Sequence, residues 1–304
     1  MLTAAEQDGG MVVQESHVMG ATGVRVPPIG QGTYRMGEGD ARRDRQEIEA
    51  LRLGIELGMT LIDTAEMYAG GRAEQLVGEA IRDVRGRVFL VTKVWPTNAS
   101  YEGTLQAARR SLARLRVDRI DLYLQHWPSE FPVRETMRAM ATLVRDGLVR
   151  FVGVSNFDAR QVQEAQEALG DIPLVADQVL YHLRQRGIEA ELLPYCEAHR
   201  VTVMAYAPLG RMGEFPGPDT PGGRLLAEIG RKYGKTPVQV ALNWLVARPS
   251  VIAIPKAARV EHVRENAGAL GWRLSEEDWK AIDEAFPAPP EPGSLPHLAP
   301  SRKR

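Results

Sequence analysis

The sequence has almost no cysteine and no excess of either charge. Cys196 is the only cysteine among 304 residues, which excludes an intramolecular disulfide and suits a reducing compartment, so we expect a cytoplasmic protein. The 38 Lys and Arg residues nearly balance the 39 Asp and Glu residues. This balance gives no reason to expect nucleic acid or an anionic membrane as a partner.

Long hydrophobic runs and metal-ligand patterns are missing as well. No stretch approaches the ~18 consecutive apolar residues of a membrane span, and residues 1–16 lack the apolar segment of a signal peptide. The six histidines show no paired spacing, so we expect no metal site. No G-x-S-x-G segment is present, which argues against a serine hydrolase.

Short apolar runs alternate with longer amphipathic segments along most of the chain. The runs are nearly continuous in apolar character, as parallel strands buried on both faces are. We expect strands at 29–34, 59–63, 88–93, 120–126, 150–154, 174–179, 201–206 and 250–254. Helices are expected at 43–57, 73–84, 102–115, 134–147, 158–168, 187–199, 223–233 and 259–269, with two extra helices at 236–247 and 275–285.

This alternation fits either a closed barrel or an open, doubly wound sheet. Polar residues decide between them, because they fall at the C-terminal ends of five different strands: Asp63, Lys93, His126, Ser155 and Gln178. A barrel builds its active site from such strand ends. The first strand carries two glycines but not the third that a dinucleotide-binding sheet needs.

We therefore predict an α/β protein, a (β/α)8 TIM barrel that forms one domain over residues 1–304. A glycine-containing turn between two short apolar runs predicts a β-hairpin at 17–28, placed across the barrel floor. The proline-rich segment 287–304 is expected to be extended.

Four residues around three neighbouring strand ends could act together on a carbonyl group. Tyr68 follows Asp63 on a loop, and a phenol, with a reference pKa near ~10, needs help to donate a proton. Lys93 could give this help by favouring the phenolate, while Asp63 keeps the lysine charged. His126 could bond the carbonyl oxygen, so the group could protonate a carbonyl while another species delivers hydride.

Taken singly, each residue has an ordinary structural explanation. Asp63 could cap a helix, Lys93 could be a solvated charge, and Tyr68 could be a packing residue. His126 could be a buried histidine that is satisfied by hydrogen bonds, and Ser155 with its neighbour could cap the following helix. All of these explanations would have to hold at once on one rim, which favours a functional group.

Several segments resemble the aldo-keto reductase family, in order from about Gly30 to Asn266. They are GMTLIDTAEMY, the strand ending at Lys93, LYLQHWP, GVSNF, AYAPLG and IPKAARVEHVRENA. The similarity is greatest to the bacterial branch of small-aldehyde reductases, including methylglyoxal reductase-like members. The resemblance implies an NADP-dependent oxidoreductase that reduces aldehydes and ketones to alcohols.

The resemblance also implies residue roles. Tyr68 would be the proton donor, tuned by Asp63 and Lys93, and His126 would orient the carbonyl. Residues implied to contact the cofactor are Thr33, Asp63, Ser155, Asn156, Gln178, Tyr206, Pro208, Leu209, Gly210, Ile254, Lys256, His262, Glu265 and Asn266. Residues implied to line the substrate pocket are Tyr34, Trp95 and Trp127.

Three positions depart from the family pattern. Tyr34 stands where tryptophan is common, Ala257 replaces a common serine, and His262 stands where many NADPH-preferring members have arginine. We therefore expect NADPH to be preferred, with NADH possible at lower preference. The expected partner is a small carbonyl compound, and we expect the chain to act as a monomer.

Two other functions fit the fold. A nucleotide-binding regulatory subunit would present a surface to a partner, usually with an extended N-terminal segment, and only about 16 weakly patterned residues precede the hairpin here. An isomerase or aldolase could use Lys93 as a Schiff-base lysine. The second alternative leaves the late segment around Lys256 unexplained.

Overall fold

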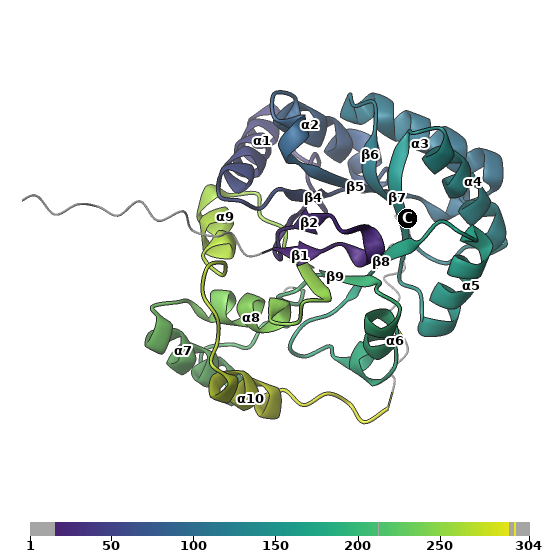
Figure 1. Ribbon diagram of the computed structural model, residues 1–304. Coiled ribbons are helices and arrows are strands. Elements are labelled where there is room, and N and C mark those ends of the chain that lie inside the picture. Colours follow the sequence, from purple (N-terminus) through teal and green to yellow (C-terminus); the bar gives the residue numbers. More distant parts are fainter. Residues whose placement is uncertain (1–15, 212, 292–294, 296–304) are drawn as a thin grey trace, which may run out of the picture.

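The structure is a computed structural model that describes residues 16–211, 213–291 and 295. Its centre is a sheet of eight parallel strands whose order follows the sequence from β3 to β10. Figure 1 shows these strands ringed by helices. The strands are β3 (Gln31–Gly32), β4 (Leu61–Asp63), β5 (Phe89–Val94), β6 (Ile120–Gln125), β7 (Val149–Ser155), β8 (Leu174–Leu180), β9 (Thr202–Tyr206) and β10 (Val251–Ile254).

The first and last strands of this sheet meet, which closes the barrel. The Gly30 N–H donates to the Ala253 carbonyl at 2.8 Å, and the Gly32 N–H donates to the Pro255 carbonyl at 3.0 Å. Ile29 pairs with Ala253 in parallel. The expected (β/α)8 barrel and all eight expected strands are confirmed.

Helices follow the strands and cover the outside of the barrel (Figure 1). Polar caps set several of their first turns, as with Asp158, whose side chain accepts the Gln161 N–H at 2.8 Å. The helices are α1 (Ala41–Glu56), α2 (Arg72–Ile81), α3 (Tyr101–Leu115), α4 (Val133–Arg145), α5 (Ala159–Leu169), α6 (Leu192–Ala198), α7 (Pro221–Tyr233), α8 (Pro237–Val246), α9 (Val260–Ala267) and α10 (Glu276–Ala285).

The two helices outside the barrel ring are α7 and α10, so placing 236–247 outside the ring from the sequence was wrong. Helix α8 packs on β10 and beside α9, while α7 and α10 pack against each other on its outer side. Every residue from 240 to 246 is buried. A helix that lies between a sheet and a further helical layer is apolar all round, and this is the composition of α8.

The expected hairpin is present at the barrel floor. Strands β1 (His17–Val18) and β2 (Arg25–Val26) pair antiparallel. The Gly20 N–H donates to Thr202 Oγ1 at 2.8 Å, at the start of β9. Gly20 has φ +49°, and a Cβ there would lie 2.5 Å from the Val175 carbonyl oxygen, so this close approach requires glycine.

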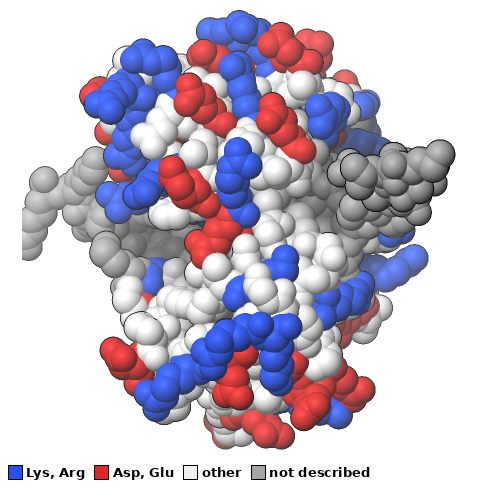
Figure 2. Space-filling model, turned by 90° about the vertical axis from the view of Figure 1, so that its left-hand side faces the viewer, with Lys and Arg blue, Asp and Glu red and all other residues white. Residues whose placement is uncertain are grey.

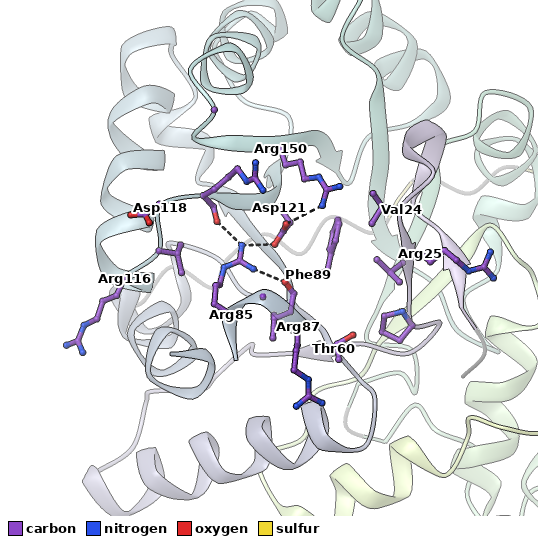
Figure 3. Close-up of a pocket in the computed structure, with 17 residues that line it drawn as sticks. Val24, Arg25, Thr60, Arg85, Arg87, Phe89, Arg116, Asp118, Asp121 and Arg150 are labelled. Atoms are coloured by element: carbon purple, nitrogen blue, oxygen red, sulfur yellow. Dashed lines mark hydrogen bonds and ion pairs between the residues drawn. The ribbon is translucent and has the colours of Figure 1, made fainter. Parts of the chain in front are cut away.

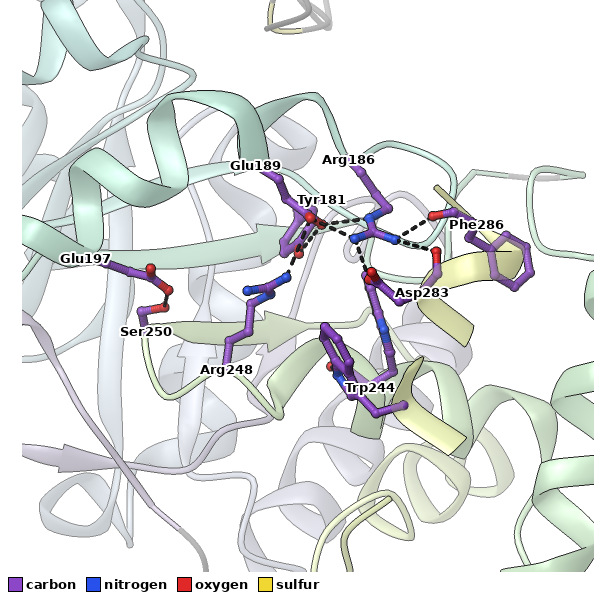
Figure 4. Close-up of polar contacts among 10 residues, drawn as sticks. Tyr181, Arg186, Glu189, Glu197, Trp244, Arg248, Ser250, Asp283 and Phe286 are labelled. Carbon is purple, nitrogen blue, oxygen red and sulfur yellow. Dashed lines mark hydrogen bonds and ion pairs between the residues drawn. The ribbon is translucent and has the colours of Figure 1, made fainter. Parts of the chain in front are cut away.

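A buried arginine fastens the loop after β8 to α10. The Arg186 guanidinium bonds both carboxylate oxygens of Glu189, the Asp283 carboxylate and the Phe286 carbonyl oxygen. It also lies 5.0 Å from the centroid of the Trp244 ring. Figure 4 shows these groups converging on one side chain from several elements. The contacts hold the outer helical layer against the barrel.

Charges of both signs are interspersed on the side where α1, α9 and α7 lie (Figure 2). Among the residues that the structure describes, no helix is long and apolar enough to cross a membrane. Within the expected extended segment 287–304, residues 292–294 and 296–304 lie outside the described part of the chain. Leu295 packs against the main hydrophobic core.

Candidate active site

A buried ion pair lies at the centre of the site. Lys93 Nζ is 2.8 Å from each carboxylate oxygen of Asp63, and it also donates to the Thr64 carbonyl at 2.8 Å. Lys93 is fully buried and Asp63 is 2% exposed. The two residues come from the neighbouring parallel strands β4 and β5, so their side chains meet inside the barrel. The explanation of Lys93 as a solvated surface charge does not apply.

Tyr68 and His126 lie beside this pair. Lys93 Nζ is 5.2 Å from the centroid of the Tyr68 ring, and the Tyr68 and His126 rings are 5.8 Å apart, edge to face. Tyr68 lies in the 3-10 turn Tyr68–Gly71 after β4, and His126 directly follows β6. The structure thus brings together the four residues expected to carry the chemistry.

Burial dominates the acidity of these groups. It raises the pKa of Tyr68 well above its ordinary value, and the nearby Asp63 carboxylate raises it further. Burial lowers the pKa of His126 well below its ordinary value, with the Lys93 charge as a second cause. Near neutral pH the site therefore holds a protonated phenol and a neutral imidazole.

The net shift of the Tyr68 pKa is upward, so burial and the Asp63 carboxylate outweigh the stabilisation of the phenolate that was expected from Lys93. Asp63 accepts from the Lys93 ammonium with both oxygens and so compensates its charge. Burial then controls the pKa of Tyr68, and the direction is upward. A raised pKa keeps the proton on the phenol at neutral pH, and its transfer to a substrate oxygen then requires stabilisation of the phenolate that forms.

Polar side chains from β7, β8 and β9 continue the site along the rim. Gln178 Nε2 donates to Asp63 Oδ1 at 2.7 Å, and Ser155 Oγ donates to the Gln178 carbonyl at 2.7 Å. Asn156 has φ +63°, a left-handed conformation, and its Nδ2 donates to the His126 carbonyl at 3.1 Å. The Tyr206 hydroxyl donates to Asn156 Oδ1 at 2.9 Å.

These bonds show that Ser155 and Asn156 do not cap the following helix. The N-cap of α5 is Asp158, which forms a capping box with Gln161. Ser155 and Asn156 instead bond groups inside the site. The helix-cap explanation for these two residues is therefore wrong.

Aromatic rings surround Tyr68 and His126. The Tyr34 ring is 5.4 Å from Tyr68, and the Trp127 ring stacks on His126 at 3.9 Å. Trp95 lies edge to face with both Trp127 at 5.4 Å and His126 at 5.8 Å. The three residues expected to line a substrate pocket thus lie next to the polar group.

Two buried polar atoms at this place have no hydrogen-bond partner among the residues that the structure describes. They are His126 Nδ1 and Trp127 Nε1. Buried polar groups in proteins are nearly always hydrogen-bonded, so these two atoms beside the Tyr68 phenol are free to bond a ligand or a water molecule. A ligand oxygen beside the phenol and the imidazole suits this arrangement, which can donate a proton to a carbonyl group.

The sequence matches the aldo/keto reductase family over residues 28–286. The chain belongs to this family. It is 44% identical over 277 residues to methylglyoxal reductase YeaE of Escherichia coli strain K12, covering 91% of this chain and 97% of that protein. It is 33% identical over 270 residues to the oxidoreductase YtbE of Bacillus subtilis strain 168, covering 86% and 89%.

A glyoxal reductase of Bacillus subtilis strain 168 is 33% identical over 266 residues, covering 86% of this chain and 89% of that protein. Among solved structures, an aldo-keto reductase from Klebsiella pneumoniae in complex with NADPH superposes with a TM-score of 0.87 at 43% identity. The match covers 94% of this chain and 100% of that one. The aldo-keto reductase resemblance is thereby confirmed, and the chain is an oxidoreductase.

Other residues implied by the aldo-keto reductase resemblance lie along the same rim. Thr33 is buried after β3 and its Oγ1 donates to the Asp63 carbonyl at 2.9 Å. Ile254 ends β10. The loop after β9 carries Pro208, Leu209 and Gly210, the last with φ +76°.

The segment around Lys256 lies between β10 and α9. Lys256 pairs with Gly32, beside β3, and its side chain is exposed. His262 is exposed on α9, while Asn266 on the same helix is buried. Glu265 Oε1 accepts from Thr236 Oγ1 at 2.9 Å, so its carboxylate already has a partner on the α8 side.

Sequence reasoning missed Glu66, whose carboxylate holds the loop that carries Trp95. Glu66 Oε1 accepts the Trp95 N–H at 2.7 Å and Asn98 Nδ2 at 3.0 Å. Its other oxygen lies 3.6 Å from Arg110 and 4.0 Å from Arg114. The available signal was an acidic residue inside the TAEMY run, between Asp63 and Tyr68, where a strand-end loop carries functional residues.

No group of three or more His, Cys, Asp or Glu side chains suited to a metal ion occurs in the described ranges. The donor set of the site consists instead of a lysine–aspartate pair, a phenol, an imidazole and several amides. This set suits an organic ligand.

Proposed function

We propose that this aldo-keto reductase reduces small aldehydes and dicarbonyl compounds to alcohols with NADPH. The observation that carries the proposal is the buried Asp63–Lys93 pair beside the Tyr68 phenol, with His126 edge to face with the same ring. The names of the relatives support the substrate class, since they include a methylglyoxal reductase and a glyoxal reductase.

Tyr68 donates the proton in the proposed reaction. The substrate carbonyl oxygen lies between the phenol and the His126 imidazole and accepts a hydrogen bond from each, which polarises the C=O bond. When bound, NADPH supplies the hydride to the carbonyl carbon. The phenol proton passes to the oxygen and gives the alcohol, and the enzyme later regains a proton from solvent.

Lys93 and Asp63 position the Tyr68 phenol and stabilise the phenolate that it becomes. Loss of the proton leaves a phenolate whose ring centroid lies 5.2 Å from Lys93 Nζ, and the attraction of this ammonium offsets part of the cost of the buried anion. Asp63 fixes the ammonium with both oxygens. A Schiff-base role for Lys93 is disfavoured, because Asp63 and the Thr64 carbonyl hold its nitrogen and burial leaves it no exposed surface.

The residues present fit nicotinamide adenine dinucleotide phosphate as the cofactor. Ser155, Asn156 and Gln178 would bond the carboxamide and Tyr206 would stack on the ring, since all four lie in one hydrogen-bonded series next to the catalytic group. Lys256 would hold the 2′-phosphate as an exposed cation at the end of β10.

The remaining contacts follow the rim between β3 and α9. Thr33, Pro208, Leu209, Gly210 and Ile254 would border the dinucleotide. His262, Glu265 and Asn266 on α9 would border its adenosine end. The Tyr34, Trp95 and Trp127 rings would make an aromatic wall for the substrate, and a tight wall favours small carbonyl compounds.

Initial rates with NADPH and NADH test the proposal over methylglyoxal, glyoxal, benzaldehyde, keto-sugars and a steroid ketone. We expect methylglyoxal and glyoxal to give the highest kcat/KM, with NADPH ahead of NADH. Efficient steroid reduction with negligible methylglyoxal activity would contradict the substrate class. Absence of carbonyl-dependent NADPH oxidation by folded protein would contradict the function.

A further inference from the structure

A pocket of about 750 Å³ lies at the barrel floor, at the opposite end from the candidate active site. Phe89 is the first residue of β5, and Asp121 and Arg150 are the second residues of β6 and β7. These strand starts form one side of the pocket, and Val24 and Pro27 from the hairpin region form another. Figure 3 shows the lining residues, with Arg85 and Arg150 turned inward and the side chains of Arg25, Arg87 and Arg116 extending outward.

The pocket collects positive charge in a chain whose formal net charge is -1. It is lined by six arginines and two aspartates and by no other charged residue. The arginines are Arg25, Arg85, Arg87, Arg116, Arg119 and Arg150. A concave site in which one sign of charge predominates raises the local concentration of ligands of the opposite sign.

One aspartate is already neutralised by its surroundings. Asp121 Oδ2 accepts from the Arg85 guanidinium at 2.7 Å and from the Leu90 N–H at 2.9 Å, and its other oxygen lies 4.0 Å from Arg150. Asp121 is 7% exposed. Figure 3 shows Arg85 and Arg150 turned toward it. The Asp121 carboxylate is therefore not available to neutralise the other arginines of the pocket.

Three arginines of the pocket have unpaired guanidinium groups. Within the described part of the chain, no ion pair or side-chain hydrogen bond is formed by Arg87, Arg116 or Arg119, and all three side chains are exposed. Long exposed arginines can turn to meet a ligand. The planar guanidinium matches a phosphate group with two parallel hydrogen bonds.

Apolar side chains supply the other part of the lining. Phe89 stacks against Phe151 with ring centroids 6.4 Å apart, and Val24, Val26 and Pro27 lie beside it. The pocket therefore combines unpaired cations with an apolar wall that can contact the carbon skeleton of a ligand. Its volume falls in the range of organic-ligand sites.

We propose that the floor pocket binds a small organic molecule that carries at least two phosphate groups. The arginines exceed the aspartates by four, so one phosphate group leaves cationic charge unbalanced whereas two balance it. The site is separate from the proposed cofactor site, because that site lies at the C-terminal ends of the strands and this one at their starts.

Calorimetric titration of the full chain tests the proposal, with fructose 1,6-bisphosphate as probe and fructose 6-phosphate as comparison. We expect the bisphosphate to bind at least about tenfold more tightly, with affinity that falls as salt is added. The titration is repeated with saturating NADP+. Loss of binding under NADP+ would assign the ligand to the cofactor site and overturn the proposal, as would equal affinity for both sugars or no binding at low salt.

Substitutions of two pocket arginines test whether the bisphosphate binds in this pocket. Removing the two charges in Arg87→Gln/Arg119→Gln is expected to weaken bisphosphate binding about tenfold or more, since charge-assisted hydrogen bonds are lost. The control is Arg231→Gln, an exposed arginine on α7 outside the pocket, which leaves binding unchanged. An equal effect of both variants, or no effect of the double variant, would overturn the proposal.

Gly86 allows a second, independent test. It lines the pocket, and a Cβ built on it meets no atom within 4 Å, so a larger side chain fits without strain. Gly86→Glu adds a negative charge and Gly86→Gln adds nearly the same volume without charge. We expect Gly86→Glu to bind the bisphosphate about tenfold more weakly than Gly86→Gln. Equal affinities would contradict recognition by charge.

Discussion

The ammonium of Lys93 lies 2.8 Å from both oxygens of the Asp63 carboxylate, and both side chains are buried. Burying either charge alone is costly, whereas the pair compensates part of that cost with short, doubled hydrogen bonds. In the proposed reaction the pair therefore serves both catalysis and stability. Substitutions that separate these two contributions can show which one a residue serves.

Lys93→Met is expected to abolish most of the carbonyl reduction and to destabilise the fold by about 3–5 kcal/mol, because Asp63 is left buried without its partner. The matched variant is Asp63→Asn/Lys93→Met, which removes both charges. It should regain most of the stability while staying inactive. Measurements are kcat/KM with methylglyoxal and denaturant unfolding. Recovery of activity in the double variant would show that Lys93 is only structural.

Tyr68→Phe should lower kcat by about 10²–10⁴-fold, the range for loss of a general acid. The dissociation constant for NADPH should change little, because the phenol acts on the carbonyl oxygen. Tyr34→Phe is the matched control, since the Tyr34 ring lies 5.4 Å from Tyr68 and loses the same atom. Near-normal turnover of folded Tyr68→Phe, or an equal loss in Tyr34→Phe, would rule out the assignment.

His126 gives a pH prediction with a definite sign. Its pKa is lowered in the fold by burial and then by the Lys93 charge, so kcat/KM should show no step near pH 6.5. The unfolded chain takes up this proton first. Stability should therefore fall as pH drops below about 6.5, and this part of the loss should vanish in His126→Asn. A step in kcat/KM near pH 6.5 that His126→Asn removes would contradict a neutral imidazole.

Glu66 is expected to position the substrate wall. Glu66→Ala leaves the half-buried backbone N–H of Trp95 without its acceptor, which costs about 1 kcal/mol and loosens the loop that carries the indole. KM for methylglyoxal should rise about tenfold while kcat changes much less, and NADPH affinity should be unchanged. Glu79→Ala, an exposed glutamate on α2, is the control. A fall in kcat alone would argue against a positioning role.

The sequence predicted the barrel well because its signal is local. Each buried strand is a short apolar run, and each strand end carries its polar residue in the same run, as in the segment from Leu61 to Asp63. The position of α8 in the inner helical layer could not be predicted from the local sequence. Its apolar residues face both β10 and α7, and only the three-dimensional packing shows which of α7 and α8 belongs to the ring.

The site shows the same division. Strand ends predicted that Asp63, Lys93 and His126 share one rim, since parallel strands end at the same edge. The direction of the pKa shift of Tyr68 could not be predicted, because it depends on burial and on Lys93 being held by Asp63. Glu66 was missed for a similar reason, because its partners Trp95 and Asn98 follow the next strand along the chain.

Cofactor choice depends on the cations near the end of β10. NADPH should bind more tightly than NADH, because Lys256 is an exposed cation between β10 and α9 and a phosphate group carries about two negative charges. Its charge-assisted hydrogen bonds contribute about 1.5–3 kcal/mol. His262 should contribute less to binding of the 2′-phosphate than an arginine, which would add a fork-shaped contact. Arg259 is already paired with Glu261 at 3.4 Å.

Dissociation constants for NADPH and NADH, measured by fluorescence quenching, test this prediction. Lys256→Ala should weaken NADPH about tenfold or more and leave NADH unchanged, whereas His262→Arg should strengthen NADPH alone. Arg231→Ala, on the outer helix α7, is the matched loss of an exposed cation and should change neither constant. If NADPH and NADH bind equally well, and still do so in Lys256→Ala, then Lys256 does not hold the 2′-phosphate. A larger effect of Arg264→Ala would move the phosphate contact to α9, because Arg264 is an exposed cation on the same helix as His262.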